Sequence, residues 1–270
     1  MIRGSLASRL MFLVRLFAAL VLGFITAPLL VIFPLSFSSS NLIVFPPPGW
    51  STKWYETLVN DPIWLDAFKN SMIVGVATAI LATVLGTMAA LALVRANVRG
   101  KAAIMGLLIA PMVVPSVITA VSLYFLFSSF GMLGTYGALI LGHTVLAIPF
   151  VVITVSSSLQ SFDNMQIKAG ASLGGAPLYV FRTVTLPQIL PGLVSGALFA
   201  FATSFDEVVL ALFLGSPTQR TLPRQIFSGV RENIDPTIAA VATLLILLVT
   251  VAMLSMEWFR SRSARRLSED

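Results

Sequence analysis

The sequence predicts an all-α membrane protein with six transmembrane helices, and three observations support this prediction. Of the 270 residues, 57% are hydrophobic and only 10% are charged, whereas a soluble domain carries about 25% charged residues. The mean hydropathy is +0.94, as expected for side chains that face lipid rather than water. The apolar residues also fall into long segments, which polar, proline-rich or basic stretches separate.

Six apolar segments are long enough for a transmembrane helix, which needs about 20 residues to cross about 30 Å of hydrocarbon. They comprise residues 10–37, 71–94, 102–129, 137–159, 190–214 and 237–258. Buried helices of soluble proteins usually stop at about 10–14 apolar residues, which disfavours that alternative. The first segment also exceeds the about 7–15 apolar residues of a signal peptide, so we expect a retained helix.

The basic residues predict the orientation of these helices. Six spans place both termini on one side, and basic residues beside spans are retained in the cytoplasm. Assigning the termini to the cytoplasm leaves on the outer side Lys53, Lys69, Arg220, Arg224 and Arg231. The remaining Lys and Arg side chains, including the arginines of residues 260–266, then flank the inner ends. The net charge of +6 thus has a topological explanation, and we expect no nucleic-acid partner.

We expect three parts along the chain: residues 1–64 with the first helix and outer loop, a core membrane domain over 65–258, and a basic cytoplasmic tail over 259–270. The outer loop contains three consecutive prolines, followed by Trp50, Trp54 and Tyr55. Trp and Tyr favour the water–lipid interface, which predicts a short interfacial helix over 53–60. An aromatic ligand cage is the alternative. The chain has no cysteine, which excludes disulfides and thiolate metal sites.

The inner connection over residues 161–188 has an organisation of its own. Residues 164–173 have helix-forming composition, and Gly174-Gly175 is suited to a left-handed helix stop. Pro177 fits the first turn of a second short helix. A helix–glycine–helix elbow of this kind is suited to docking into a groove of another protein. The alternative is a surface loop that only connects two spans.

This segment resembles the cytoplasmic signature of permease subunits of binding-protein-dependent ABC importers. The matching residues are Ala169, Leu173-Gly174, Phe181, Val184, Leu186-Pro187 and Pro191-Gly192. The spacing Leu-Gly-x-x-Pro-x-x-x-Phe-x-x-Val-x-Leu-Pro is specific, and the segment lies between the fourth and fifth spans, as it does in such permeases. The resemblance covers about residues 65–258 and, more loosely, the first helix.

The resemblance implies a type I ABC importer permease fold in a bacterial inner membrane, with a cytoplasmic coupling helix that docks into a separate ATPase. The implied partners are a second permease subunit in a heterodimer, two ATPase subunits that bind ATP and Mg, and a periplasmic substrate-binding protein. The implied coupling residues are Lys168, Ala169, Gly170, Leu173, Gly174, Phe181, Leu186 and Pro187. The chain itself lacks a G-x-x-x-x-G-K-[ST] loop, so we expect neither enzyme activity nor a bound cofactor.

Two positions depart from the signature. Lys168 stands where the signature usually has Glu, and Gly170 stands where it has its second Ala. The first change reverses a charge on the docking surface, which predicts an acidic position of the ATPase facing Lys168. The second lowers helix propensity by about 1 kcal/mol relative to Ala.

Asp206 and Glu207 lie inside the otherwise apolar fifth segment. A carboxylate deep in a bilayer costs at least about 2.5–3.5 kcal/mol, so such a group usually faces a protein interior or a transport pathway. Adjacent helical positions point about 100° apart, so we expect one carboxylate, Asp206, on the pathway and the other against a neighbouring helix. The alternative is a structural pair.

A narrower resemblance links the chain to the second permease of spermidine/putrescine importers. It rests on residues 203–209, Leu222-Pro223, residues 235–243 and Lys53-Trp54-Tyr55. It implies a small cationic solute, and the candidate pathway residues are Asp206, Glu207, Ser204, Phe205, Ser116 and Tyr124. Polyamine relatives often have an acid after the proline of the third span, where this chain has Ser116. That difference keeps an amino-acid derivative or an opine open as the substrate.

His143 is the only histidine, and we expect it to be hydrogen-bonded across helices rather than to relay protons or bind a metal. Two other classes of protein compete with the importer subunit. A secondary transporter would show two related halves, and a membrane-embedded enzyme would need a nucleophile–base pair or metal cluster. Neither feature is evident in the sequence.

Overall fold

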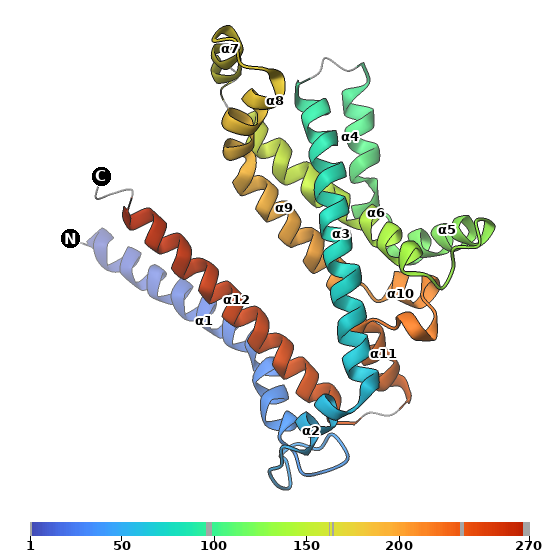
Figure 1. The fold of residues 1–270 in the computed structure, drawn as a ribbon. Coiled ribbons are helices and arrows are strands. Elements are labelled where there is room, and N and C mark those ends of the chain that lie inside the picture. The colour runs from blue at the N-terminus through green and yellow to red at the C-terminus, as the bar shows by residue number, and fades with distance from the viewer. Residues whose placement is uncertain (1, 96–98, 162, 164, 233–234, 267–270) are drawn as a thin grey trace. The chain divides into compact units, whose positions relative to one another are not determined.

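The computed structural model describes residues 2–95, 99–161, 163, 165–232 and 235–266, and within these it describes side chains over 11–231 and 235–251. The regular secondary structure of the described residues is helical, apart from one isolated β-bridge between Ser38 and Trp50 (Figure 1). Its contacts divide it into two units. Unit 1 comprises Met1–Pro62 and Ser228–Asp270, and unit 2 comprises Ile63–Phe227.

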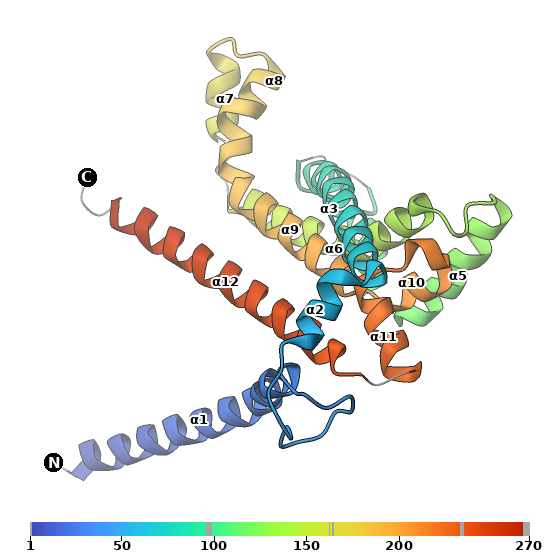
Figure 2. The same ribbon diagram turned by 60° about the horizontal axis from the view of Figure 1, so that its bottom comes forward.

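Helices of unit 1 include α1 (Ile2–Ser36), α2 (Lys53–Asn60) and α12 (Thr237–Arg266). Both α1 and α2 contact α12, and Figure 2 shows α1 and α12 diverging toward the two termini. The short helix predicted over 53–60 is confirmed as α2, and its interfacial location stays a prediction. Between Met11 and Ser36, α1 contains a long hydrophobic stretch whose side chains are not buried. Such a stretch suits a helix that faces lipid.

Unit 2 is built around three long helices, α3 (Pro62–Arg95), α6 (Tyr136–Gln160) and α9 (Leu186–Asp206). Small residues let them approach closely. A Cβ atom on Gly86 of α3 would lie 2.7 Å from Val151 Cβ of α6, and one on Gly196 of α9 would lie 2.6 Å from Thr154 Oγ1 of α6. The buried residues between these helices are mainly Ala and Val, as close helix packing requires.

The remaining elements of unit 2 are shorter. They are α4 (Lys101–Ile109), η1 (Ala110–Met112), α5 (Ser116–Ser129), α7 (Met165–Ser172), α8 (Pro177–Val180), η2 (Phe181–Thr185), α10 (Val209–Leu214) and η3 (Pro217–Gln219), with α11 (Leu222–Glu232) at the boundary of the units. A second core joins α3, α5, α6 and α10 through residues such as Val74, Phe127, Leu139 and Leu214. Figures 1 and 2 both place α7 and α8 at one end of unit 2 and α10 at the other.

Four described helices are long and apolar enough to cross a membrane, over Met11–Ser36, Pro62–Arg95, Tyr136–Gln160 and Pro177–Asp206. A bent pair, Lys101–Met112 with Ser116–Ser129, makes a fifth candidate. The sixth predicted segment coincides with α12, whose described apolar part is shorter and covers Thr237–Val251. The structure therefore shows four or five candidate spans, and the six-span topology stays a prediction, as do the boundaries at 64/65 and 258/259.

The third predicted span is not one continuous helix. Its two parts meet at an angle of 100°, and Pro115 at the start of α5 has an extended conformation with ψ of 132°. Proline has no N–H group for a helix interior, and the residue before it disfavours the helical region. The prolines at 111 and 115 therefore break the span that the sequence predicts over residues 102–129.

Candidate functional site

The fifth predicted span also breaks, and the break separates the two acidic residues. Helix α9 ends at Asp206, and Glu207 follows in an extended conformation with φ of −77° and ψ of 114°. The expectation that both acids lie within one helix was therefore wrong. Along α9, Asp206 lies about 30 Å from Leu186, since each residue rises about 1.5 Å. It is thus at the end of the helix rather than near its middle.

Glu207 explains the break. One of its carboxylate oxygens accepts hydrogen bonds from the backbone N–H groups of Val209 at 2.7 Å and Leu210 at 3.0 Å. These N–H groups belong to the first turn of α10 and have no partner within that helix. A carboxylate there also interacts favourably with the helix dipole. Glu207 therefore caps α10.

Asp206 has different surroundings. Its side chain is exposed, and among the described residues it has no hydrogen-bond or ion-pair partner. Thr203 lies three positions earlier, on the same face of α9. Thr203 lines a cavity of about 390 Å³, whose other lining residues are Pro111, Met112, Val113, Val114, Pro115, Ser116, Leu146 and Phe150. The break in the third span and the end of α9 thus border one cavity.

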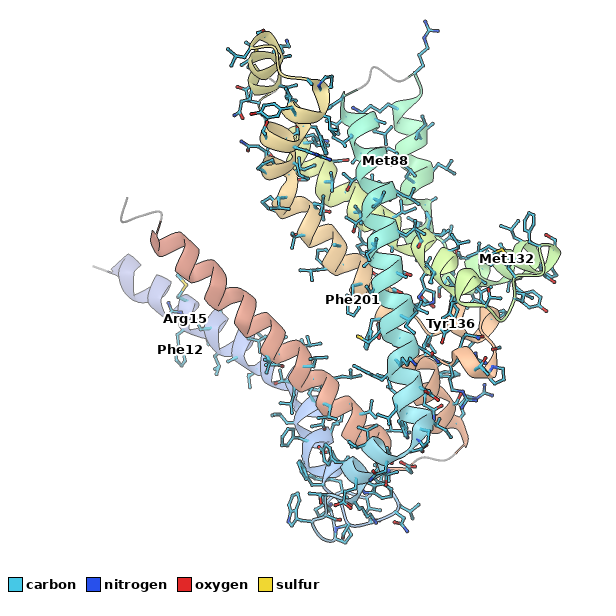
Figure 3. The ribbon with its side chains drawn as sticks, in the orientation of Figure 1. Phe12, Arg15, Met88, Met132, Tyr136 and Phe201 are labelled. Carbon is cyan, nitrogen blue, oxygen red and sulfur yellow. The ribbon has the colours of Figure 1, made fainter. Side chains whose placement is uncertain are left out.

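The cavity brings together only part of the predicted pathway residues. Ser116 lines it, whereas Tyr124 does not, and the ring of Tyr124 packs edge-on against Phe125 at 5.7 Å. Phe205 stacks on Phe201 with ring centroids 5.5 Å apart. Phe201 in turn lies beside Gly75 of α3, and Figure 3 shows it on the side of α9 that faces α3. The aromatic faces therefore belong largely to helix packing.

His143 and Ser204 join α6 to α9 two residues before Asp206. The two side chains are buried, and His143 Nδ1 lies 2.8 Å from Ser204 Oγ. The predicted cross-helix hydrogen bond of His143 is confirmed. The other ring nitrogen, Nε2, is buried without a hydrogen-bond partner among the described residues. Ser204, predicted on the pathway, is thus placed toward α6 in this structure.

The elbow over residues 161–188 has the predicted form. Helix α7 is followed by Gly174 with φ of +82°, and Pro177 begins α8. The left-handed glycine closes the turn, since Gly175 N–H donates to the carbonyl of Gly170 at 3.1 Å. The helix–glycine–helix prediction is confirmed.

The elbow presents an exposed surface with an apolar centre. Leu173 at the turn is 89% exposed, and Leu178 and Tyr179 of α8 are also exposed. Lys168 and Ala169 lie exposed on α7. Exposed apolar clusters of this kind are typical of surfaces that contact a protein, a membrane or a ligand.

Three further coupling candidates lie at the base of the elbow. Phe181 is half-buried in η2, Pro187 is exposed in the first turn of α9, and Leu186 packs against the core between α3, α6 and α9. The base is tied to α3 by Arg95, whose guanidinium donates to Thr185 Oγ1 at 2.9 Å. The elbow therefore continues into α9 without a flexible connection.

The packing of α7 against α8 explains why a glycine stands at position 170. A Cβ atom at this position would lie 3.3 Å from Val180 Cγ2, which is tighter than ordinary van der Waals contact. Glycine lets α7 and α8 pack closely, so the loss of helix propensity is offset by the tertiary contact.

The sequence did not identify some residues of these sites. Gly192 and Gly196 pack α9 against α6, and their spacing of four was the available signal. Thr203 lines the cavity, but a single threonine in an apolar span carries no signal of its own. Among the described residues, no three His, Cys, Asp or Glu side chains are grouped as metal ligands.

Comparison with known proteins decides the family. Residues 82–265 match the family described as the binding-protein-dependent transport system inner membrane component. The chain belongs to this family. It is therefore a permease subunit of an ABC importer and a multi-pass protein of the inner membrane. In this family the permease is not itself catalytic and binds no cofactor, since ATP is hydrolysed on a separate subunit that assembles with the permease and a binding protein.

Several relatives are similar over most of the chain. The putrescine transport system permease protein PotI of Escherichia coli K12 is 38% identical over 240 residues, which are 84% of each chain. The spermidine/putrescine transport system permease protein PotC of the same organism is 32% identical, over 89% of this chain and 91% of its own. The molybdenum transport system permease protein ModB of Mycobacterium bovis is 31% identical, over 76% and 81%.

The fold of the permease is also found in a solved structure. A chain from a bacterial ABC transporter involved in the import of the acidic polysaccharide alginate superposes with a TM-score of 0.76. The superposition covers 94% of the permease and 98% of that chain, with 16% sequence identity. At this identity the likeness concerns the fold alone.

Proposed function

We propose that this permease forms part of the translocation path for a small organic cation, such as putrescine or spermidine, and that Asp206 contacts the cation. The observation that carries the proposal is the free carboxylate of Asp206 at the end of α9. It lies one helical turn beyond Thr203, which lines the cavity shared with Ser116. A carboxylate without a protein counter-ion attracts an ammonium group, and the threonine and serine hydroxyls accept its remaining hydrogen bonds.

The relatives support a cationic substrate without deciding it. PotI and PotC are permeases of putrescine and spermidine/putrescine systems, whereas ModB belongs to a molybdenum transport system. Ser116 also stands where an acid would add a second negative charge. A zwitterion, such as an amino-acid derivative or an opine, is therefore the second candidate. It needs one carboxylate for its ammonium group, which Asp206 supplies.

In the assembly that we propose, the permease pairs with a different permease subunit, and two ATPase subunits bind below them. Six spans with cytoplasmic termini place the elbow on the ATPase side and the end of α9 toward the outer side. The apolar surface around Leu173 enters a cleft of one ATPase subunit, with Lys168 beside an acidic residue of that subunit. The single helix α9 then connects the docking surface with Asp206.

Uptake of radiolabelled putrescine and spermidine tests the substrate proposal. Cells express the permease with the neighbouring genes for its partner subunits, and wild type is compared with Asp206→Asn. We expect the substitution to abolish most uptake, because a neutral amide does not balance the substrate charge. ATPase activity of the purified complex should persist, since Asp206 lies about 30 Å along α9 from the elbow.

Asp66→Asn serves as the control, because Asp66 is another exposed carboxylate of unit 2 and does not line the cavity. It should leave uptake unchanged. If the wild-type complex hydrolyses ATP but imports neither polyamine, the polyamine assignment is wrong, and zwitterionic amino-acid derivatives are tested next. Full uptake by Asp206→Asn would remove Asp206 from the pathway.

A further inference from the structure

The loop between α1 and α2 is an ordered element of unit 1. Its two ends are paired, with Ser51 N–H donating to the carbonyl of Phe37 at 2.7 Å and Ser39 N–H to that of Gly49 at 2.9 Å. Trp54 of α2 donates its indole N–H to the carbonyl of Ser38 at 2.7 Å. These bonds hold the intervening residues 40–48 in a defined position beside the end of α1.

The held loop has an apolar tip. Leu42, Ile43, Val44 and Phe45 are consecutive and exposed, with Leu42 67% and Phe45 61% exposed, and Trp50 follows at 71%. Residues 37–52 contain no charged side chain. Four consecutive exposed apolar residues are unfavourable in water and indicate a surface that contacts lipid or another molecule.

Where the two ends of the loop meet α1 lies an apolar cleft of about 590 Å³. It is lined by Phe33, Pro34, Phe37, Trp50, Ser51 and Thr52, so it joins the last turns of α1 to the far end of the loop. Phe37 packs between Phe33, at 5.8 Å, and Tyr55, at 5.0 Å between ring centroids. Aromatic residues therefore form half of the residues that line the cleft.

The position of the cleft along α1 indicates its depth in the membrane. From Arg15 to Ser36 the helix rises about 30 Å, which is the thickness of the hydrocarbon core. Arg15 is exposed, projects near the amino-terminal end of α1 in Figure 3, and suits one boundary of that core. Phe33, Pro34 and Phe37 then lie at the opposite boundary, where aromatic side chains favour the interface.

We propose that the cleft and the apolar tip bind a phospholipid of the leaflet opposite the amino terminus, with an acyl chain in the cleft and residues 42–45 immersed at the headgroup level. The apolar exposed face of α1 leads directly into the cleft, and the uncharged loop suits hydrocarbon better than a charged protein surface. This inference depends on the membrane location of the family and not on the substrate.

The ammonium group of Lys53 already occupies the face of the Trp54 ring. This contact disfavours an aromatic cage for a cationic substrate in this loop. Lys53 Nζ lies 4.5 Å from the centroid of the Trp54 ring. The same ammonium group donates to the carbonyl of Ser39 and to Asn41 Oδ1, both at 2.7 Å. A ligand of the cleft is therefore recognised by apolar contact.

Spin labelling tests the proposal, and the natural absence of cysteine makes the permease suitable for it. The purified complex, with serine in place of any cysteine in its partner subunits, is reconstituted in nanodiscs of phosphatidylethanolamine and phosphatidylglycerol. Nitroxide labels are placed at Val44→Cys, at Leu22→Cys within α1 as the lipid reference, and at Glu56→Cys on α2 as the water reference. Power saturation with oxygen and with a nickel chelate reports the environment of each label.

We expect the Val44 label to be more accessible to oxygen and less accessible to the nickel chelate than the Glu56 label, with values between those of Glu56 and Leu22, as the headgroup level requires. With Trp258→Phe introduced in both proteins, brominated phospholipid should also quench tryptophan fluorescence less in Trp50→Phe than in the parent, because Trp54 and Trp64 are buried. Nickel accessibility at Val44 equal to that at Glu56 would overturn the proposal. The same holds if the Val44 label becomes protected only after the purified binding protein is added, since the tip would then be a protein docking surface.

Discussion

Asp206 and Glu207 are neighbours in the chain, yet their carboxylates have different surroundings. Glu207 accepts two backbone N–H groups of α10, whereas Asp206 is exposed at the end of α9. The His143–Ser204 hydrogen bond lies two residues earlier and holds the same end of α9 against α6. At the scale of single residues, Glu207, His143 and Ser204 stabilise the end of α9. Asp206 is the residue that we propose to contact the substrate.

Replacing Glu207 tests its capping role. Glu207→Ala removes the acceptor for two N–H groups, so we expect a loss of about 1 kcal/mol in stability. Glu207→Gln keeps a side-chain oxygen and should lose less. The thermal unfolding midpoint of the detergent-purified complex measures both changes. If Glu207→Gln unfolds like wild type but transports no substrate, the negative charge of Glu207 is needed on the pathway, which contradicts a capping role alone.

A double-mutant cycle tests the contact between His143 and Ser204. Each single substitution, His143→Ala or Ser204→Ala, leaves a buried polar atom unpaired, which costs about 1–3 kcal/mol. The double substitution leaves neither atom, so its cost should be clearly less than the sum of the single costs. Unfolding midpoints of the four complexes provide the comparison. Additive effects would show that the two side chains do not interact in the assembled protein.

At the scale of elements, the elbow depends on one backbone conformation. Gly174 has φ of +82°, and α7 and α8 pack closely because Gly170 and Gly175 have no side chains to separate them. Arg95 ties the base of the elbow to α3. The shape of the proposed docking surface is therefore determined by glycines and by the Arg95 contact rather than by the exposed side chains that it presents.

Gly174→Ala tests this dependence. A Cβ atom there meets no other atom within 4 Å, so the expected cost of about 1–2 kcal/mol comes from the left-handed backbone alone. We expect less ATPase to co-purify with the permease. Gly106→Ala is the matched control, because it also lies in open space but within helix α4, where alanine is favoured. Equal effects of the two substitutions would argue against a special backbone requirement at the elbow.

For the whole molecule, helix α9 is the direct connection between the elbow and Asp206. It runs without a break from Leu186 to Asp206 and packs along α6 through glycines. In the proposed mechanism, a displacement of the elbow by the ATPase reaches the cavity through this helix. The effect of the ATPase therefore depends on how firmly the elbow is docked.

Lys168→Glu tests the docking of the complete assembly. A like charge facing the proposed acidic position should weaken the binding of the ATPase by about 1 kcal/mol, or about fivefold. Co-purification of the ATPase at low and high salt measures the effect, which salt should reduce. Arg182→Glu is the control, as another exposed basic residue of the elbow segment. Unchanged assembly in Lys168→Glu would contradict an acidic partner, and so would an equal loss in the control.

The sequence by itself determined the membrane class, the elbow with its left-handed glycine, helix α2 and the family resemblance. These features depend on local composition and on residues that are close in the chain, so periodicity and spacing reveal them. The same holds for the cross-helix role of His143, because a lone buried histidine needs a polar partner.

The tertiary structure alone decided which acidic residue is free, why Gly170 replaces alanine, and that the third span breaks at 100° beside Thr203. Each of these depends on contacts between residues that are distant in the sequence, or on a backbone conformation that the residue types alone do not determine. Glu207 and Asp206 look alike in the sequence, because a carboxylate in an apolar segment costs the same until its hydrogen-bond partners are known. The partners are supplied by folding.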